Sequence, residues 1–226
     1  MLKAVIFDLF ETLITEWGHE KYTKKKISED LGLDLELFNR YWEENEQGRY
    51  QGKVSFEDSI RYVCMRCGVT LLPETLARVT GKRMATKAAC FDFIDPDIIV
   101  LVKELKARGL RLGMLSNCSS EEVTAIRQSQ LCAFFDALVL SYEAGLSKPD
   151  PLIYSRVLAE LHVTAAECLF VGDGGSNELE GARRAGMAAV QAKWYTDRHP
   201  MKRESMEGFN AAQRPLELLR YFTAQP

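Results

Sequence analysis

Near its start the chain reads LKAVIFDLFET over residues 2–12, an almost continuous apolar run that stops at the carboxylate of Asp8. A strand that is buried on both faces of a parallel sheet has this character, because helices cover both sides of such a sheet. The run therefore predicts a buried parallel strand whose carboxyl end presents Asp8 and the residues that follow it.

Later segments of the chain repeat this pattern of short apolar runs, at residues 110–115, 137–140, 168–171 and 188–192. Helical patterns separate them, at residues 96–108, from residue 119 onward, and at residues 150–161 and 176–186. Strands that alternate with helices are typical of βαβ units. We therefore expect an α/β fold with a Rossmann-like, three-layer core, in which helices cover both faces of a parallel sheet of about five or six strands.

Residues 15–92 interrupt this alternation, because they contain helical patterns and no convincing strand. We interpret them as an all-helical insert that follows the first strand directly. The predicted domains are therefore a discontinuous α/β core of residues 1–14 and 93–226, and a helical domain of residues 15–92. Near the end of the chain, residues 196–213 are expected to form a loop before a short C-terminal helix.

The composition excludes several classes of protein. The chain has 226 residues, of which 46% are hydrophobic and 27% charged, as in ordinary globular proteins. Its net charge of −3 lacks the basic field of a nucleic-acid-binding protein, so we expect no nucleic-acid partner. No apolar run approaches the roughly 20 residues that span a bilayer, and the first run meets Asp8 too soon for a signal peptide. We expect a cytoplasmic protein without a membrane partner, either a monomer or a homodimer.

The six cysteines fit this expectation, because cytoplasmic thiols are mostly reduced. Cys64 and Cys67 have the CxxC spacing, but neither a second pair nor a nearby His completes a metal site. They also fall within a helical pattern. We therefore interpret them as packed thiols and leave any other role open.

Polar residues follow four of the predicted strands at their carboxyl ends. Ligands of open parallel sheets gather along this edge, so residues distant in sequence are expected to form one site there. The site would combine carboxylates, hydroxyls, an amide and one ammonium group, from Asp8, Thr12, Ser116, Asn117, Lys148, Asp173 and Glu178.

This ordered set of residues resembles the haloacid dehalogenase (HAD) superfamily of hydrolases over nearly the whole chain. The resemblance implies that Asp8 is the nucleophile and that Ser116 hydrogen-bonds the transferring phosphoryl group. It also implies that Lys148 neutralises charge on the nucleophile and phosphate, that Asp173 binds magnesium, and that Glu178 orients metal-bound water. The helical insert between the first two motifs matches the C1-type cap of this family.

The charges of these residues favour the same chemistry. A carboxylate can attack phosphorus to form an aspartyl phosphate, which water then cleaves. Asp8, Asp173 and Glu178 contribute −3 against +1 from Lys148, so a phosphate of about −2 needs a divalent cation. Mg²⁺ prefers oxygen ligands and commonly sits between carboxylates and phosphate. The expected ligands are Asp8, Asp173 and the backbone carbonyl of Phe10.

Substrate binding is expected from both parts of the chain. At the strand ends, the expected partners of the phosphate are Thr12, Ser116, Asn117 and Lys148. In the insert, residues 47–53 read QGRYQGK and are expected to form a flexible loop between two helices. Arg49 of this loop would hold a substrate anion, unless the loop is only a solvated connection.

Phe10 departs from the family pattern, which has a second Asp two residues after the nucleophile as general acid and base. The side chain of Phe10 cannot transfer a proton, a contribution typically worth about 10²–10⁴-fold in rate. Three interpretations follow. Glu11 replaces the missing acid, or the enzyme is restricted to good leaving groups, or the reaction needs no leaving-group proton, as in hydrolytic dehalogenation.

The dehalogenase branch of the family also lacks the second Asp, and DLFET at residues 8–12 resembles its motif loosely. That branch uses no metal, however, and has neutral residues in place of Asp173. We therefore expect a magnesium-dependent phosphatase that acts on a small phosphorylated metabolite. A 2-haloacid dehalogenase-like hydrolase and a weakly active or non-catalytic ligand-binding relative remain the alternatives.

Overall fold

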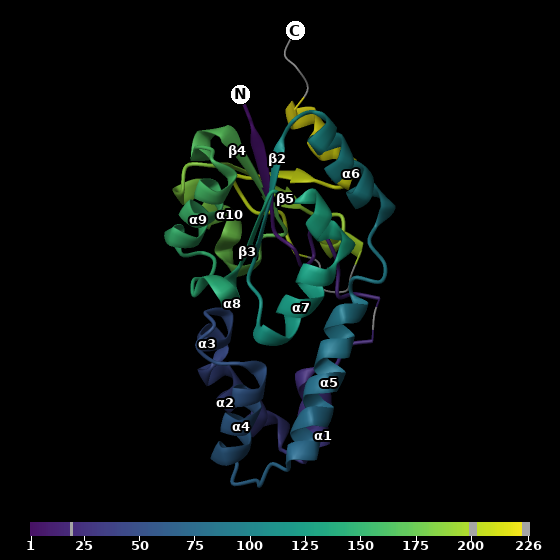
Figure 1. Ribbon diagram of the computed structural model, residues 1–226, viewed down its shortest axis with the longest axis vertical. Coiled ribbons are helices and arrows are strands. Elements are labelled where there is room, and N and C mark those ends of the chain that lie inside the picture. The colour runs from purple at the N-terminus through teal and green to yellow at the C-terminus, as the bar shows by residue number, and fades with distance from the viewer. Residues whose placement is uncertain (19, 199–202, 223–226) are drawn as a thin grey trace.

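A computed structural model describes residues 1–18, 20–198 and 203–222 of the chain. The sheet and its flanking helices form one end of the molecule, and the helices that follow the first strand form the other (Figure 1). We call this second part, comprising α1 to α5, the helical lobe. The chain enters it after the first strand and leaves it before α6, so the sheet is built from segments on both sides of the insert.

The sheet has six strands, all parallel, in the order β3-β2-β1-β4-β5-β6. The first strand lies inside the sheet, where Val5 pairs with Leu112 on one side and Leu169 on the other. Every residue of this strand is buried, as its apolar sequence predicts. The strand bounds are β1 Ala4–Phe7, β2 Arg111–Ser116, β3 Ala137–Leu140, β4 Cys168–Gly172, β5 Ala188–Ala192 and β6 Asn210–Ala212.

Helices cover both faces of the sheet, and successive residues of β1 face opposite layers. Val5 and Phe7 pack in a cluster with residues of α6, α7 and the C-terminal 3₁₀ helix. Ala4 and Ile6 pack in a second cluster with residues of α9 and α10. The predicted α/β fold with a three-layer core is thus confirmed. The helix bounds are α6 Pro96–Ala107, α7 Ser120–Gln128, α8 Ser141–Ala144, α9 Pro151–Leu161 and α10 Glu178–Arg184. The 3₁₀ helices are Gln130–Phe134, Ala165–Glu167, Gly175–Asn177, Thr196–Arg198 and Pro215–Phe222.

The helical lobe has a separate apolar core. The ring of Trp42 stacks on Phe38 at 5.4 Å and meets Phe56 edge-on at 5.6 Å. Among the described residues, no helix has both the length and the apolar character of a membrane span. The helix bounds are α1 Lys24–Leu31, α2 Leu35–Glu44, α3 Glu46–Tyr50, α4 Phe56–Arg66 and α5 Pro73–Ala89.

The cysteines are all free thiols. Cys64 is buried in α4, and Cys67 is the C-cap residue that directly follows this helix. Burial raises the pKa of both thiols, which makes them less reactive at neutral pH. The environment of this CxxC pair is therefore that of packing residues.

Two local expectations are wrong. The predicted loop at residues 47–53 is largely helical, because α3 continues to Tyr50. The predicted loop at residues 196–213 contains β6, a strand of only three residues that pairs with β5. Residues 199–202 of that loop lie outside the described part of the chain. The sequence of β6, Asn-Ala-Ala, has no branched or aromatic residue, so it carries little strand propensity of its own.

Candidate active site

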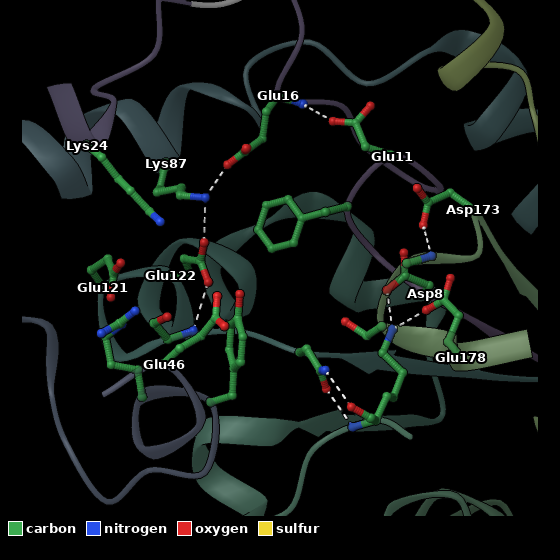
Figure 2. Close-up of a pocket in the computed structure, with 18 of the residues that line it drawn as sticks. Asp8, Glu11, Glu16, Lys24, Glu46, Lys87, Glu121, Glu122, Asp173 and Glu178 are labelled. Carbon is green, nitrogen blue, oxygen red and sulfur yellow. Dashed lines mark hydrogen bonds and ion pairs between the residues drawn. The ribbon is translucent and has the colours of Figure 1, made fainter. Parts of the chain in front are cut away.

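A cleft of about 380 Å³ separates the carboxyl edge of the sheet from the helical lobe. Figure 2 shows Asp8, Asp173 and Glu178 gathered at one side of this cleft, and Lys87, Glu16 and Glu122 at the other. From the sheet side the lining includes Asp8, Phe10, Glu11, Asn117, Lys148, Asp173 and Glu178. From the helical lobe it includes Lys24, Ile27, Trp42, Glu46, Arg49, Tyr50, Arg83 and Lys87.

Lys148 joins two of the acidic residues. Its Nζ lies 2.5 Å from Asp8 Oδ1 and 2.5 Å from Glu178 Oε2, and all three side chains are buried. Burial opposes the charge of the ammonium group, but Asp8 and Glu178 outweigh this effect and raise the pKa of Lys148. The lysine therefore stays protonated, and the two carboxylates supply the counter-charge that a buried cation needs.

Asp8 is held in one orientation. Thr12 Oγ1 donates a hydrogen bond of 3.1 Å to Asp8 Oδ2, while Lys148 contacts the other carboxylate oxygen. The loop that carries Thr12 is itself fixed, because Trp194 Nε1 donates to the carbonyl of Thr12 at 2.8 Å. The carboxylate is thus preorganised at the end of the buried first strand, as a nucleophile must be.

The loop after β4 presents two more carboxylates. The backbone N–H of Gly175 donates to Asp173 Oδ1 at 2.9 Å, and that of Gly174 donates to Glu178 Oε1 at 3.0 Å. Gly174 adopts a φ of +97°, a conformation that side chains rarely permit. Burial, followed by the charge of Asp8, raises the pKa of both Asp173 and Glu178. A nearby cation would therefore stabilise the ionised form of each carboxylate.

These carboxylates fit a divalent cation. One oxygen from each of Asp8, Asp173 and Glu178 lies within 4.8 Å of the others, and all three side chains are buried. Lys148 supplies one positive charge and Arg203, which contacts Asp173, supplies a second, so the three carboxylates keep an excess of one negative charge. A ligand set made only of oxygen atoms suits Mg²⁺ better than a metal that prefers thiolate or imidazole ligands.

The residues at the end of β2 support this cluster. The Asn117 amide exchanges two hydrogen bonds with the backbone of Lys148, at 3.0 Å and 2.8 Å. This side chain therefore positions the lysine, a role that the sequence did not suggest. Ser116 is fully buried, and its hydroxyl makes only a long contact of 3.4 Å with a neighbouring carbonyl. A hydroxyl in such a weak contact can still donate to a better acceptor.

The residues after Asp8 do not supply a free acid. Phe10 lines the cleft and packs against the apolar core below it. The Glu11 carboxylate accepts hydrogen bonds from Thr15 Oγ1 at 2.6 Å and from the backbone N–H of Glu16 at 2.9 Å. Burial raises the pKa of Glu11. Both of its carboxylate oxygens therefore hold the turn that leaves the first strand, and Figure 2 shows the contact with Glu16.

A charged contact between α7 and the helical lobe is absent from the sequence-based predictions. Lys87 of α5 binds Glu16 and lies 2.6 Å from Glu122 of α7. The adjacent Glu121 lies 3.3 Å from Arg83, also on α5. We call these two acidic residues and their partners the α7 contact. Locally, Ser119-Ser120-Glu121-Glu122 is a sufficient helix start, so no sequence pattern indicates these partners.

Arg203 is a second residue that the sequence did not indicate. Its Nε lies 3.0 Å from Asp173 Oδ2. The loop that carries it is attached by Gln191, which is fully buried. The Gln191 amide donates to the carbonyls of Asp173 and Glu204 and accepts from the N–H of Met206. A cation bound at Asp173 would therefore share this carboxylate with a guanidinium group.

Arg49 belongs to the cleft but sits in α3 rather than in a loop. Only 4% of the residue is exposed. The guanidinium lies 3.8 Å above the centre of the Trp42 ring, and its Nη1 donates to the Trp42 carbonyl at 2.8 Å. Stacking on an aromatic ring is a common use of arginine, and it fixes the plane of the group.

Comparisons with known proteins find both a phosphatase and a dehalogenase among the proteins that this chain resembles. The chain is 28% identical over 229 residues to a glyceraldehyde 3-phosphate phosphatase of Methanopyrus kandleri, covering 97% of this chain and 96% of that protein. It is 26% identical over 179 residues to an (S)-2-haloacid dehalogenase of Pseudomonas putida, covering 75% of each.

Solved structures show the same fold. A HAD phosphatase from Thermococcus onnurineus superposes with a TM-score of 0.65 at 21% identity, covering 98% of both chains. A 2-haloacid dehalogenase from Pseudomonas syringae superposes with a TM-score of 0.69 at 18% identity, covering 99% of this chain and 100% of that one. The model of the haloacid dehalogenase-like hydrolases matches residues 2–186. With the strand-end carboxylates and the buried lysine in place, this match shows that the chain belongs to the haloacid dehalogenase-like hydrolase family.

Proposed function

We propose that this hydrolase is a magnesium-dependent phosphatase that acts on a small phosphorylated metabolite through an aspartyl phosphate at Asp8. The observation that carries the proposal is the meeting of Asp8, Lys148 and Asp173 at one side of a cleft. A dehalogenase that uses no metal has no need for three buried carboxylates whose negative charge exceeds the positive charge of the Lys148 ammonium and the Arg203 guanidinium. Relatives that are named phosphatases support the same conclusion.

In the proposed reaction an Asp8 oxygen attacks the phosphorus, and the bond from phosphorus to the leaving oxygen breaks. Water then attacks the aspartyl phosphate and releases inorganic phosphate. Lys148 holds Asp8 and offsets the charge of the phosphoryl oxygens, while the hydroxyls of Thr12 and Ser116 can donate to them. Mg²⁺ held by Asp8, Asp173 and the Phe10 carbonyl would supply the remaining positive charge.

We also propose that the helical domain predicted for residues 15–92 acts as a cap. Its helices line the cleft opposite Asp8, so they contact the leaving group and not the phosphoryl group. Closure of such a cap excludes water from the reacting groups. Selectivity among substrates would then depend on helical-lobe residues such as Arg49.

Phosphate and halide release, each with Mg²⁺ and with EDTA, test the proposed function. We expect an aryl phosphate such as 4-nitrophenyl phosphate to be hydrolysed with Mg²⁺ and not with EDTA. Halide release from a 2-halo acid in EDTA would instead identify a dehalogenase, which Phe10 and the dehalogenase relative favour. If neither product appears under any condition, the protein is a non-catalytic relative and the proposal is wrong.

The Phe10→Asp variant tests whether the missing acid limits the rate. Without a general acid, an alkoxide leaves slowly, whereas an aryl oxide needs no proton. We expect the variant to raise kcat/KM for alkyl phosphates by at least about tenfold, the lower part of the range for general acid catalysis. Its kcat/KM for an aryl phosphate should change much less.

The Phe10→Asn variant is the matched control. It introduces a polar side chain of the same size as Asp, but this side chain cannot donate an acidic proton. Steady-state kinetics on paired alkyl and aryl phosphates provide the measurement. An equal gain in the Asn variant, or no gain in the Asp variant, would show that proton transfer at this position does not limit turnover.

A further inference from the structure

The cationic side chains that line the cleft differ in how their charges are balanced. Within the part of the chain that the structure describes, these residues are Lys24, Arg49, Arg83, Lys87, Lys148 and Arg203. Five of them lie within 4.0 Å of a carboxylate oxygen. Within the described residues, Arg49 has no carboxylate at that distance.

Arg49 is also more deeply buried than the other helical-lobe cations of the cleft, with 4% of the residue exposed against 7% for Lys87. Its contacts are the carbonyl and the ring of Trp42, and neither carries a charge that balances the guanidinium. Arginine stays protonated in proteins. A buried cation without an anionic partner is costly, so this position is suited to an anion that the protein itself does not supply.

The nearby carboxylates are already occupied or solvated. Burial lowers the pKa of Arg49, and the charges of Tyr50, Glu121 and Glu46 oppose this effect only in part. Glu121 lies 3.3 Å from Arg83 and so balances that residue. Glu46 is exposed, so water already solvates its charge. Neither residue removes the need of Arg49 for an anion.

We propose that Arg49 binds a carboxylate on the leaving group. The substrates are then small phosphate esters whose leaving group carries a carboxylate. This inference rests on the proposed phosphatase function. Asp8 and Arg49 line the same cleft of about 380 Å³ from its sheet side and its helical side, so one small molecule reaches both. A planar guanidinium, fixed by stacking on Trp42, suits a planar carboxylate.

The charge of the cleft favours a carboxylate over a second phosphate. Among the described lining residues, eight carboxylates stand against six cations, so an additional group of charge −2 would increase an existing excess of negative charge. One guanidinium balances one carboxylate. The substrate therefore carries a phosphoryl group at one end and a single negative charge at the other.

The test compares two aryl phosphates that differ only in this charge: 3-carboxyphenyl phosphate and 3-carbamoylphenyl phosphate. Both have leaving groups that need no general acid, so Phe10 does not limit either of them. We expect the wild-type protein with Mg²⁺ to prefer the carboxylate by roughly tenfold or more in kcat/KM, as one charge-assisted contact allows. The difference should appear mainly in KM, because the contact is remote from phosphorus.

Variants of Arg49 then assign the preference to this residue. Arg49→Gln should remove the preference for the carboxylate, and Arg49→Lys should retain part of it. Arg61→Gln is the control, because Arg61 is an exposed arginine of the same lobe that contacts Glu57 and Asp58 and should leave the ratio unchanged. Each result is the ratio of two kcat/KM values measured on the same protein sample. If part of the Arg49→Gln protein is unfolded, both values fall equally and the ratio does not change.

The outcomes separate this inference from the proposed function. If neither aryl phosphate is hydrolysed with Mg²⁺, the phosphatase proposal fails. If both are hydrolysed without preference, or if Arg49→Gln keeps the preference, the proposed function stands and the carboxylate site at Arg49 is wrong.

Discussion

Replacing Asp8 by Asn is expected to lower kcat for phosphate release by roughly 10⁴-fold or more, on the scale seen when a covalent nucleophile is removed. The Asn side chain has the shape of Asp, its carbonyl oxygen can still accept from Lys148, and its NH2 group can donate to the Thr12 hydroxyl, the two residues that contact Asp8 in the native site. An amide, however, does not attack phosphorus under these conditions. The expected result is a folded protein without turnover.

Steady-state phosphate release with Mg²⁺ measures this effect, and thermal unfolding verifies the fold of the variant. Asp34→Asn is the matched control, because Asp34 caps α2 in the helical lobe and Asn caps helices equally well. The control should keep wild-type activity. A variant of Asp8 that retains more than about a tenth of the wild-type kcat would show that another group is the nucleophile.

Replacing Lys148 by Met is expected to destabilise the fold by about 3–5 kcal/mol, the typical cost of removing one partner of a buried ion pair. The ammonium group lies 2.5 Å from carboxylate oxygens of both Asp8 and Glu178, and these side chains are only 8% and 1% exposed. Methionine fills a similar volume but leaves two carboxylates buried without a counter-charge. Urea unfolding in EDTA measures the loss without a contribution from bound metal.

The loss should depend on pH. Burial and Asp8 raise the pKa of Glu178 even in the native protein, and removal of the ammonium group raises it further. In the unfolded chain this carboxyl has its ordinary pKa, so the folded variant binds more protons and loses stability as the pH rises. The deficit relative to wild type should therefore be larger at pH 8 than at pH 5.

Lys3→Met provides the comparison, because Lys3 also lies 2.5 Å from a carboxylate but is 63% exposed. Removing such a solvated pair should barely change the urea midpoint. If Lys148→Met and Lys3→Met are equally stable at both pH values, Lys148 does not compensate the buried carboxylates, and the electrostatic argument for this site is wrong.

The sheet could be predicted from the sequence because each of its main strands is a buried apolar run. The predicted segment 137–140 matches β3 residue for residue, and 168–171 differs from β4 only by Gly172. The short strand β6 could not be found in this way. It depends on pairing with β5, and its own sequence is a polar residue and two alanines.

The carboxylate cluster was predictable for a topological reason. In a parallel sheet every strand delivers its following residues to the same edge, so Asp8 and Asp173 meet although 165 positions separate them in the sequence. Arg203 was not predictable, because its approach to Asp173 depends on how Gln191 attaches a loop. Lys87 likewise reaches Glu122 only once the helical lobe has docked.

The α7 contact joins α7 to the helical lobe through Lys87 and Arg83 of α5, so it bears on the motion of the proposed cap. Its contacts are ion pairs, with Lys87 and Glu122 each less than a tenth exposed. When both partners of such a pair move into solvent together, the hydration of the two charges offsets most of the attraction that is lost. If the helical lobe acts as the proposed cap, its opening would therefore have little net cost in free energy, and the same ion pairs would re-form on closing. Charged side chains would give the closed position of the proposed cap its accuracy, whereas an apolar interface would hold the cap tightly closed and slow its opening.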